Sequence, residues 1–470
     1  MFTSMRLKNF KSWADTGELR LAPVTGFFGA NSSGKSSLLH AFVLMKQTAQ
    51  SSDAASALNL GDKNRIVDFG NLSQVTHGNI FEQLGMEFRW ETEPWLAALT
   101  RRAAKKTETS SDAIDRYHRI AFDKDLEFQF QMVGLGSDIE SLSYKTGANI
   151  LEYKKTSDSL VAENGSFELR FATVSEQPLN ALPDDSIPDL DPPTKCYKFS
   201  NSAHHATHGS SILATLEREF EQQFVQKLHY LGPLRTRGER VYNWRQSAPF
   251  DVDVDGSNTV QALLAARDHG KPNARPSRME GSSGEPISVE EHVAQWLKEL
   301  GLASVFETRK LQGADDFYEV LLRTESKSKP ISLVDVGFGV SQVLPVLVLL
   351  AYVPEGVTVL LEQPEMHLHP ASQSALADIL LEVATERKLQ VIVESHSEHL
   401  LTRLQRRVAE GVVDDDDVAL YFCEHDGHKS EITPLKLNED GEIGNWPKNF
   451  FGDAMGEAVA MVEARAHRHK

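Results

Sequence analysis

The stretch Gly29-Ala30-Asn31-Ser32-Ser33-Gly34-Lys35-Ser36 decides the fold of this chain. It matches the pattern G-x-x-x-x-G-K-[ST], in which backbone N–H groups surround phosphate groups at the start of a helix. The apolar segment 24–28 before it is typical of a buried strand, and residues 38–43 after it carry an apolar helical stripe. We therefore predict a strand, a phosphate-binding loop and a helix, rather than a chance glycine-rich turn.

This loop predicts a bound nucleotide, ATP with Mg²⁺. Lys35 would reach the β- and γ-phosphates, and Ser36 would ligate the Mg²⁺. The residues expected to contact the nucleotide are Asn31, Ser32, Ser33, Gly34, Lys35, Ser36 and Ser37.

Two later segments also run from an apolar strand into polar residues. Segment 357–362 ends at Glu362, and because ligands bind at the carboxyl edge of open α/β sheets, Glu362 is expected to hold the metal or its water. Segment 391–397 ends in Glu-Ser-His-Ser, where His396 could donate a hydrogen bond to the γ-phosphate. A strand capped by a solvated glutamate and a satisfied loop histidine are the alternatives.

These three motifs, taken with the segment Asp335-Val336-Gly337-Phe338-Gly339-Val340-Ser341-Gln342, resemble the ATPase heads of the ABC superfamily, in the branch that includes SMC and OLD-type proteins. The resemblance implies a Walker A loop, a degenerate signature loop at Gly337, Gly339 and Ser341, a Walker B strand ending at Glu362, and an H-loop histidine at His396. It also implies a homodimer in which ATP lies between the Walker A loop of one head and the signature loop of the other.

Within that branch the chain is similar to stand-alone ATPases of bacterial anti-phage systems, of the Septu and PARIS type, that carry a short DUF3696-like tail. The similarity lies in segments 365–370 (Glu-Met-His-Leu-His-Pro), 230–235 (Tyr-Leu-Gly-Pro-Leu-Arg) and 444–451 (Gly-Asn-Trp-Pro-Lys-Asn-Phe-Phe).

The end of the Walker B strand departs from the family pattern. ABC heads usually place Asp-Glu there, whereas this chain has Glu362-Gln363. A glutamine cannot accept a proton as a general base, and such assistance is typically worth about 10²- to 10⁴-fold in rate. Either Glu365 takes that role, beside Gln363 and His396 as catalytic residues, or turnover is slow and ATP acts as a clamp. Gln74 is the candidate for the glutamine that contacts Mg²⁺ in such heads.

The motifs at the two ends of the sequence predict one α/β head interrupted by an insertion. We expect residues 1–90 and 331–470 to form its halves, with a mostly parallel sheet flanked by helices. Residues 91–330 are expected to add an antiparallel β region, an α/β insertion and mobile loops. A capping box at Ser288 and Glu291 predicts a helix start, and residues 183–193 are rich in the Pro and Asp of turns.

Bulk composition narrows the function. The net charge of −18 disfavours a protein that mainly wraps nucleic acid, because such affinity comes from Lys and Arg. Only two cysteines occur, and no signal-peptide-like or membrane-spanning run is present, so we expect a cytoplasmic protein with buried thiols.

One local basic strip could still contact DNA or an acidic partner. It comprises Arg235, Arg237, Arg240 and Arg245, interleaved with Tyr242 and Trp244. A solvated surface or an intersubunit contact is the alternative.

Three functions fit these features. The first is an ATPase that scaffolds or regulates a separate effector, most simply a nuclease. The second, an OLD-type nuclease in the same chain, would need a TOPRIM domain, but only 74 residues follow His396. The third, a DNA-repair or chromosome-type ATPase with a long arm, would need sustained heptads, which residues 91–330 lack.

Overall fold

A computed structural model describes residues 1–53, 56–61, 65–78, 83–92, 124–133, 138–147, 149–156, 166–173, 185–207, 211–269, 272–274, 287–314, 316–325, 328–447, 450, 460–461 and 464–465. Residues 93–123 and 275–286, which belong to the region expected to contain mobile loops, lie outside these residues. Within the described helices, none is both long and apolar enough to cross a bilayer.

A six-stranded sheet forms the centre of the molecule. Its strands, in spatial order, are β11 (Leu228–Leu231), β18 (Thr358–Glu362), β19 (Gln390–Glu394), β4 (Val24–Gly29), β20 (Val418–His425) and β21 (Ser430–Leu435). The first five are parallel and β21 is antiparallel. β4, from the start of the chain, thus lies between β19 and β20 from its end.

Both faces of this sheet are covered, which explains its continuously apolar strands. Phe27 and Ile392 belong to a core cluster with α1 (Lys35–Gln50). The alternate residues Phe28 and Val393 belong to a second cluster, formed with α9 (Phe338–Tyr352), α10 (Pro370–Glu386) and α11 (Glu398–Ala409).

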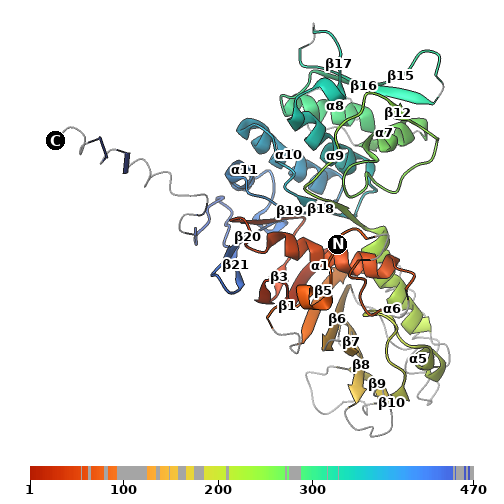
Figure 1. Cartoon of the computed structure of the whole chain (residues 1–470). Helices are drawn as coiled ribbons and strands as arrows, with labels where there is room; N and C mark the ends of the chain where they lie inside the picture. The colour runs from red at the N-terminus through yellow and green to blue at the C-terminus, as the bar shows by residue number, and fades with distance from the viewer. Residues whose placement is uncertain are drawn as a thin grey trace.

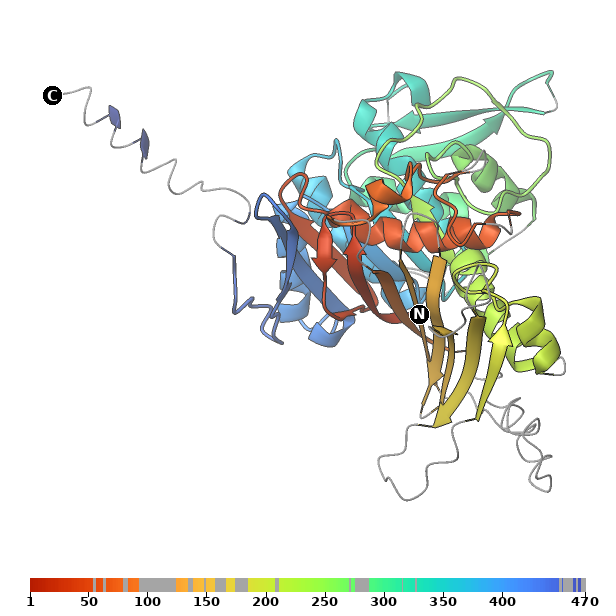
Figure 2. The ribbon, with the colours of Figure 1, turned by 60° about the horizontal axis from the view of Figure 1, so that its bottom comes forward.

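A second, nine-stranded antiparallel sheet packs on the other side of α1. Its strands are β10 (Asp185–Leu190), β9 (Ser166–Thr173), β8 (Asn149–Thr156), β7 (Asp138–Thr146), β6 (Asp125–Val133), β5 (Leu84–Glu91), β1 (Phe2–Phe10) and β2 (Trp13–Asp15), with β3 (Leu19–Arg20) beside β1. Phe42 of α1 contacts Phe2 and Phe88 of this sheet, with ring centroids 4.9 and 5.0 Å apart. Figure 2 shows its yellow strands extending away from the central sheet beside α5 (Asn201–Ala206) and α6 (Ser211–Glu221).

The edge strand β10 differs from the sequence-based expectation. Residues 185–190 pair with β9 although they contain Pro188 and were expected to form a turn-rich linker. Pro is tolerated on an edge strand because its missing N–H need not pair. The register shift between Ile187 and Leu190 lies at this proline.

The third unit is a smaller α/β insertion at the opposite end from β7–β10 (Figure 1). It contains β12 (Tyr242–Asn243), β15 (Val305–Lys310), β16 (Phe317–Arg323), β17 (Ile331–Ser332), the hairpin β13 (Pro272–Ala274) and β14 (Ile287–Ser288), and the helices α7 (Thr259–Asp268) and α8 (Val289–Glu299). The capping box is confirmed, because the Ser288 hydroxyl accepts from the Glu291 N–H at 3.2 Å and Glu291 accepts from the Ser288 N–H at 2.8 Å. The α/β class, with its parallel sheet, antiparallel region and insertion, is confirmed.

Candidate nucleotide-binding site

The phosphate-binding loop joins β4 to α1, as its sequence predicts. Gly29 has φ 141° and Gly34 has φ 89°, both in the region that favours glycine. A Cβ on Gly29 would lie 2.0 Å from the Cys423 carbonyl oxygen, so no larger residue fits between the loop and β20. The loop conformation therefore depends on both glycines.

Lys35 begins α1 and is turned back over its own loop. Its Nζ donates to the carbonyl oxygens of Gly29 at 3.1 Å and Ala30 at 2.6 Å. Burial lowers the pKa of Lys35, and the nearby Glu394 carboxylate opposes that shift. The ammonium is thus held at the loop by neutral acceptors that a phosphate group can replace.

A cleft of about 320 Å³ opens over this loop. The residues that line it are Lys11, Ser12, Asn31, Ser32, Ser33, Gly34, Lys35, Ser36, Ser37, Gln363, Glu394 and His396. All the loop residues expected to bind nucleotide therefore meet Gln363 and His396, which follow β18 and β19. The first turn of α1 also points the positive end of the helix dipole at this loop, which favours an anion.

Glu394 also lines this cleft, and sequence reasoning did not select it. It ends β19, and its Oε2 accepts a hydrogen bond from the Ser36 hydroxyl at 2.7 Å. Burial and the neighbouring Glu362 carboxylate raise the pKa of Glu394. The available signal was a second acid at a strand end, in the same position as Glu362.

Glu362 ends β18, directly beside Glu394 in the sheet register. Its Oε1 accepts from the Tyr230 hydroxyl at 2.8 Å and lies 2.8 Å from His40 Nε2. Glu362 does not line the cleft, and it stands one strand farther from β4 than Glu394 does.

Gln363 and Glu365 occupy different positions. Gln363, with φ 45°, faces the cleft, and its N–H donates to the Glu394 carbonyl at 2.9 Å. Glu365 is buried behind it, where its Oε1 accepts from the Ser395 hydroxyl at 2.7 Å and from the His396 N–H at 2.9 Å. Burial raises the pKa of Glu365. Glu365 does not line the cleft, so its contacts fix the chain around His396.

His396 lies at the cleft with a neutral ring. Burial, followed by the charge of Lys35, lowers the pKa of His396 from its ordinary value of 6.5. A neutral imidazole has one N–H, which can serve as a donor to phosphate. This placement fits the H-loop expectation.

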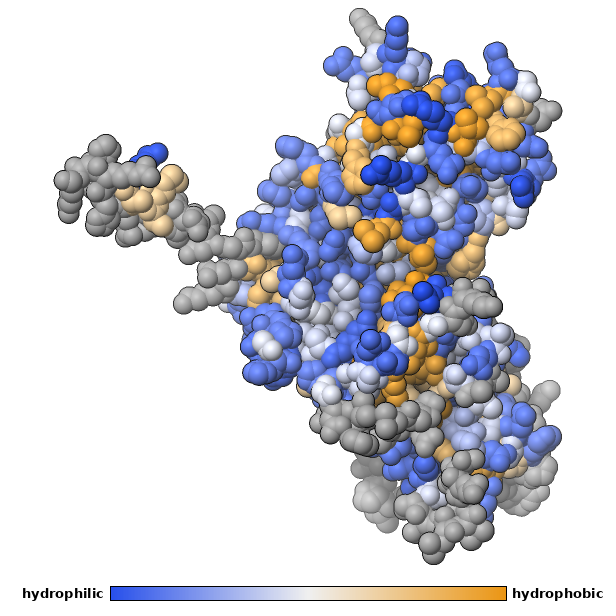
Figure 3. Space-filling view, viewed as in Figure 1, coloured by the Kyte–Doolittle hydropathy of each residue, from blue (hydrophilic) through white to orange (hydrophobic). Residues whose placement is uncertain are grey.

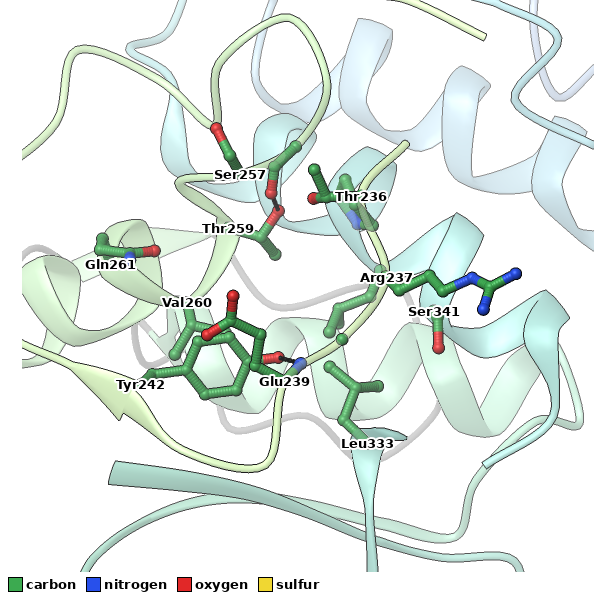
Figure 4. A pocket seen from close by; sticks show the side chains of 14 residues that line it. Thr236, Arg237, Glu239, Tyr242, Ser257, Thr259, Val260, Gln261, Leu333 and Ser341 are labelled. Atoms are coloured by element: carbon green, nitrogen blue, oxygen red, sulfur yellow. Dashed lines mark hydrogen bonds between the residues drawn. The ribbon is translucent and has the colours of Figure 1, made fainter. Parts of the chain in front are cut away.

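The signature residues Gly337, Gly339 and Ser341 stand at the start of α9 and do not line the cleft of their own chain. A Cβ on Gly339 would lie 2.7 Å from the His367 carbonyl oxygen, so this position needs glycine. Ser341 instead borders a small cavity of about 110 Å³ (Figure 4). Phe338 beside them is exposed.

Gln74 is not brought to the cleft. It lies in the short helix α2 (Leu72–Val75), and its side-chain oxygen accepts from the Asn71 N–H at 3.0 Å as part of a capping box. The side chain is therefore used within its own turn.

The basic strip does not form a continuous surface. Tyr242 and Trp244 are core residues, and Arg240 forms a two-bond ion pair with Asp335 at 2.7 Å. Arg235 is buried, where it donates to the carbonyl oxygens of Gln342 at 3.1 Å and Glu362 at 2.8 Å. Arg237, Arg240 and Arg245 are exposed, whereas the interleaved aromatic residues are buried, and contact of this strip with DNA or an acidic partner stays a prediction.

Two known protein families match the chain. Residues 24–402 match the family described as "AAA domain, putative AbiEii toxin, Type IV TA system", and residues 413–461 match DUF3696, a family of proteins of unknown function. No curated protein matches the chain.

Solved structures similar to the chain include SMC heads. The SMC head domain from Thermotoga maritima is 12% identical with a TM-score of 0.40, and the match covers 93% of this chain and 99% of that one. An Smc head with an extended coiled coil, bound to the C-terminal domain of ScpA derived from Pyrococcus furiosus, is 11% identical with a TM-score of 0.41 and covers 99% of both chains. Since the first family match spans most of the chain and contains the P-loop cleft, this chain belongs to the AAA-domain ATPase family described as putative AbiEii toxin.

Proposed function

We propose that the chain binds ATP with Mg²⁺ in the P-loop cleft and hydrolyses it slowly. The observation that carries this proposal is the convergence of Lys35, Ser36, Glu394 and His396, from two segments far apart in the sequence, on one cleft. The ammonium, the helix N-terminus and the neutral imidazole all favour the negative charge of a triphosphate.

The residues present fit a magnesium ion. Mg²⁺ prefers oxygen ligands and is usually held by one or two carboxylates together with phosphate groups. The Ser36 hydroxyl and the Glu394 carboxylate supply such oxygens 2.7 Å apart at the cleft wall. When bound, the ion would offset the phosphate charge that builds up during transfer.

Slow turnover follows from Gln363. Its amide can orient an attacking water molecule, but it cannot take the proton. Bound ATP then holds the assembly together for long periods, as a clamp, and the rate of hydrolysis sets how long the assembly lasts.

The clamp would hold two copies of the chain together. Two observations support this part of the proposal: the signature residues do not line the cleft of their own chain, and Phe338 and Val334 beside them are exposed. Figure 3 shows further apolar surface on the unit that contains α7 and α8. From the resemblance to anti-phage ATPases, we propose that the pair scaffolds or regulates a separate effector, such as a nuclease.

Nucleotide affinity of the Lys35→Ala variant tests the proposal. Loss of a charged hydrogen-bond donor costs about 1.5 to 3 kcal/mol, so binding of a fluorescent ATP analogue should weaken about 10- to 100-fold. Lys298→Ala, an exposed position on α8, is the matched control and should bind as the wild type does. Unchanged affinity in Lys35→Ala would refute the assignment of the cleft.

The effector is tested with the product of a neighbouring gene. We expect it to co-purify with the wild type in Mg²⁺ and ATP, and to be released or deregulated with Lys35→Ala. Association that depends neither on nucleotide nor on Lys35 would argue against a nucleotide-controlled scaffold.

A further inference from the structure

Two carboxylates compete for the role of metal ligand, and the structure distinguishes them. Glu362 and Glu394 end neighbouring parallel strands at the same level. β19, which bears Glu394, pairs directly with β4, whereas β18 does not. Since neighbouring strands lie about 4.8 Å apart, Glu394 starts about one strand spacing from the P-loop strand and Glu362 about two.

The Glu362 carboxylate is already engaged by fixed donors. Its Oε1 accepts from Tyr230 and contacts His40 Nε2, each at 2.8 Å. Lys11 Nζ lies 3.3 Å from His40 Nδ1, and because an ammonium can only donate, the ring must present its hydrogen on Nε2 to Glu362. Glu362 therefore ties β11 and α1 to the end of β18.

The Glu394 carboxylate faces the cleft. It lines the cavity over the P-loop and accepts from the hydroxyl of Ser36, the residue whose position in the motif is that of the Mg²⁺ ligand. The side chain that donates to Glu394 is thus itself an expected ligand of the ion.

We propose that Glu394, rather than the Walker B residue Glu362, is the carboxylate that holds the nucleotide-associated Mg²⁺ together with Ser36. The inference rests on the proposed ATP site and names its metal ligand. Glu362 is then a positioning residue, which fixes Tyr230 and His40 around the same strand ends.

The test compares Glu394→Gln with Glu362→Gln by titrating Mg²⁺ into protein and a fluorescent ATP analogue. In excess EDTA, all variants should bind the analogue with the same affinity as the wild type. In the titration, Glu394→Gln should need at least about tenfold more Mg²⁺ to reach half of the metal-dependent change. Glu362→Gln should stay within about threefold of the wild type. Manganese EPR of the nucleotide complexes reads the bound ion directly and should show the same order.

The outcomes separate the two proposals. If the wild type binds no nucleotide with or without Mg²⁺, the ATP site itself fails, and this inference with it. If the wild type binds but Glu394→Gln keeps the wild-type Mg²⁺ midpoint, or Glu362→Gln alone shifts it, only the choice of ligand is overturned. Glu394→Asp, which keeps the charge and shortens the side chain, serves if Glu394→Gln does not fold: it should raise the midpoint, and an unchanged midpoint contradicts the inference.

Discussion

At the scale of single residues, Gln363 and Glu365 differ in position: Gln363 lines the cleft, and Glu365 does not. Gln363 faces the cleft at the position where a proton acceptor is expected, and Glu365 lies behind it on the backbone of His396. In the proposed ATPase, an amide thus stands where the base is expected.

Restoring a carboxylate at the cleft should therefore speed turnover. We expect Gln363→Glu to raise the rate of phosphate release at saturating ATP and Mg²⁺ by about tenfold or more, because general-base assistance is worth about 10²- to 10⁴-fold when it is fully placed. The double variant with Lys35→Ala is the control for contaminating activity. An unchanged rate would show that no acceptor is missing at this position.

Glu365 is expected to act by position rather than as the base. Its Oε1 accepts two hydrogen bonds, which the oxygen of a glutamine side chain can also accept. We therefore expect Glu365→Gln to keep most of the wild-type hydrolysis and Glu365→Ala to lose most of it. If both variants abolish phosphate release to the same extent while nucleotide binding persists, Glu365 is the base after all.

The P-loop residues were predictable because the motif is local: glycine spacing, a preceding strand and a following helix are all contiguous in sequence. Glu394 was not selected, because an acid at the end of a strand is usually solvated and this weak signal does not show which of two such acids faces the P-loop. Its role depends on β19 lying between β18 and β4, which is a property of strand order. Gln74 was placed by family pattern alone, and its side chain is taken up by a local cap.

At the scale of elements, a strand or helix was predicted correctly where a single sequence signal outweighed the others. The capping box at Ser288 set the start of α8, and buried apolar runs set β18 and β19. The edge strand β10 was missed because turn-forming residues outweighed the weak signal of a strand that pairs on one side only.

The contact between α8 and α10 is expected to make the free energy of unfolding depend on pH. Burial and the charges of Glu382 and Asp378 raise the pKa of Glu299 from 4.5 to about 7. A raised carboxyl pKa means that the folded state binds the proton more tightly, so its favourable contribution is present below pH 4.5 and is lost as pH rises through 7.

Glu299→Gln should prevent this loss of stability at high pH, because a glutamine side chain does not ionise. Since the side chain is half-buried, we discount the full shift to about 1 kcal/mol of added unfolding free energy at pH 8, with little difference at pH 5. Denaturant unfolding at the two pH values measures it, with Glu290→Gln, in the first turn of the same helix, as the comparison. Equal destabilisation of Glu299→Gln at both pH values would contradict the assignment.

At the scale of the whole molecule, the nucleotide cleft and the signature loop are separate surfaces. The small cavity beside α9 is lined by Tyr242, Leu333 and Arg237 among others, and the guanidinium of Arg237 points away from Tyr242 (Figure 4). In the proposed ATP sandwich, the two parts would thus come from different surfaces of the chain.

Phe338 gives a direct test of the pairing of two copies. It is 46% exposed beside the signature residues, so Phe338→Asp should cost little folding stability. We expect it to abolish the dimer that forms with ATP and Mg²⁺, measured by light scattering, while the affinity of the monomer for nucleotide is kept. Phe317→Asp, another exposed phenylalanine on β16, is the control. Dimers that survive Phe338→Asp would move the interface elsewhere.

The guanidinium of Arg235 links the backbone behind these two surfaces within the chain, since it donates to the carbonyl oxygen of Gln342 on α9 and to that of Glu362 at the end of β18. If either backbone segment shifts, its hydrogen bond to Arg235 must break, or the other segment must move with it. In a paired assembly, the filling of one cleft and the fit of the neighbouring copy would then change together, and the two clefts would fill cooperatively through one buried side chain in each copy.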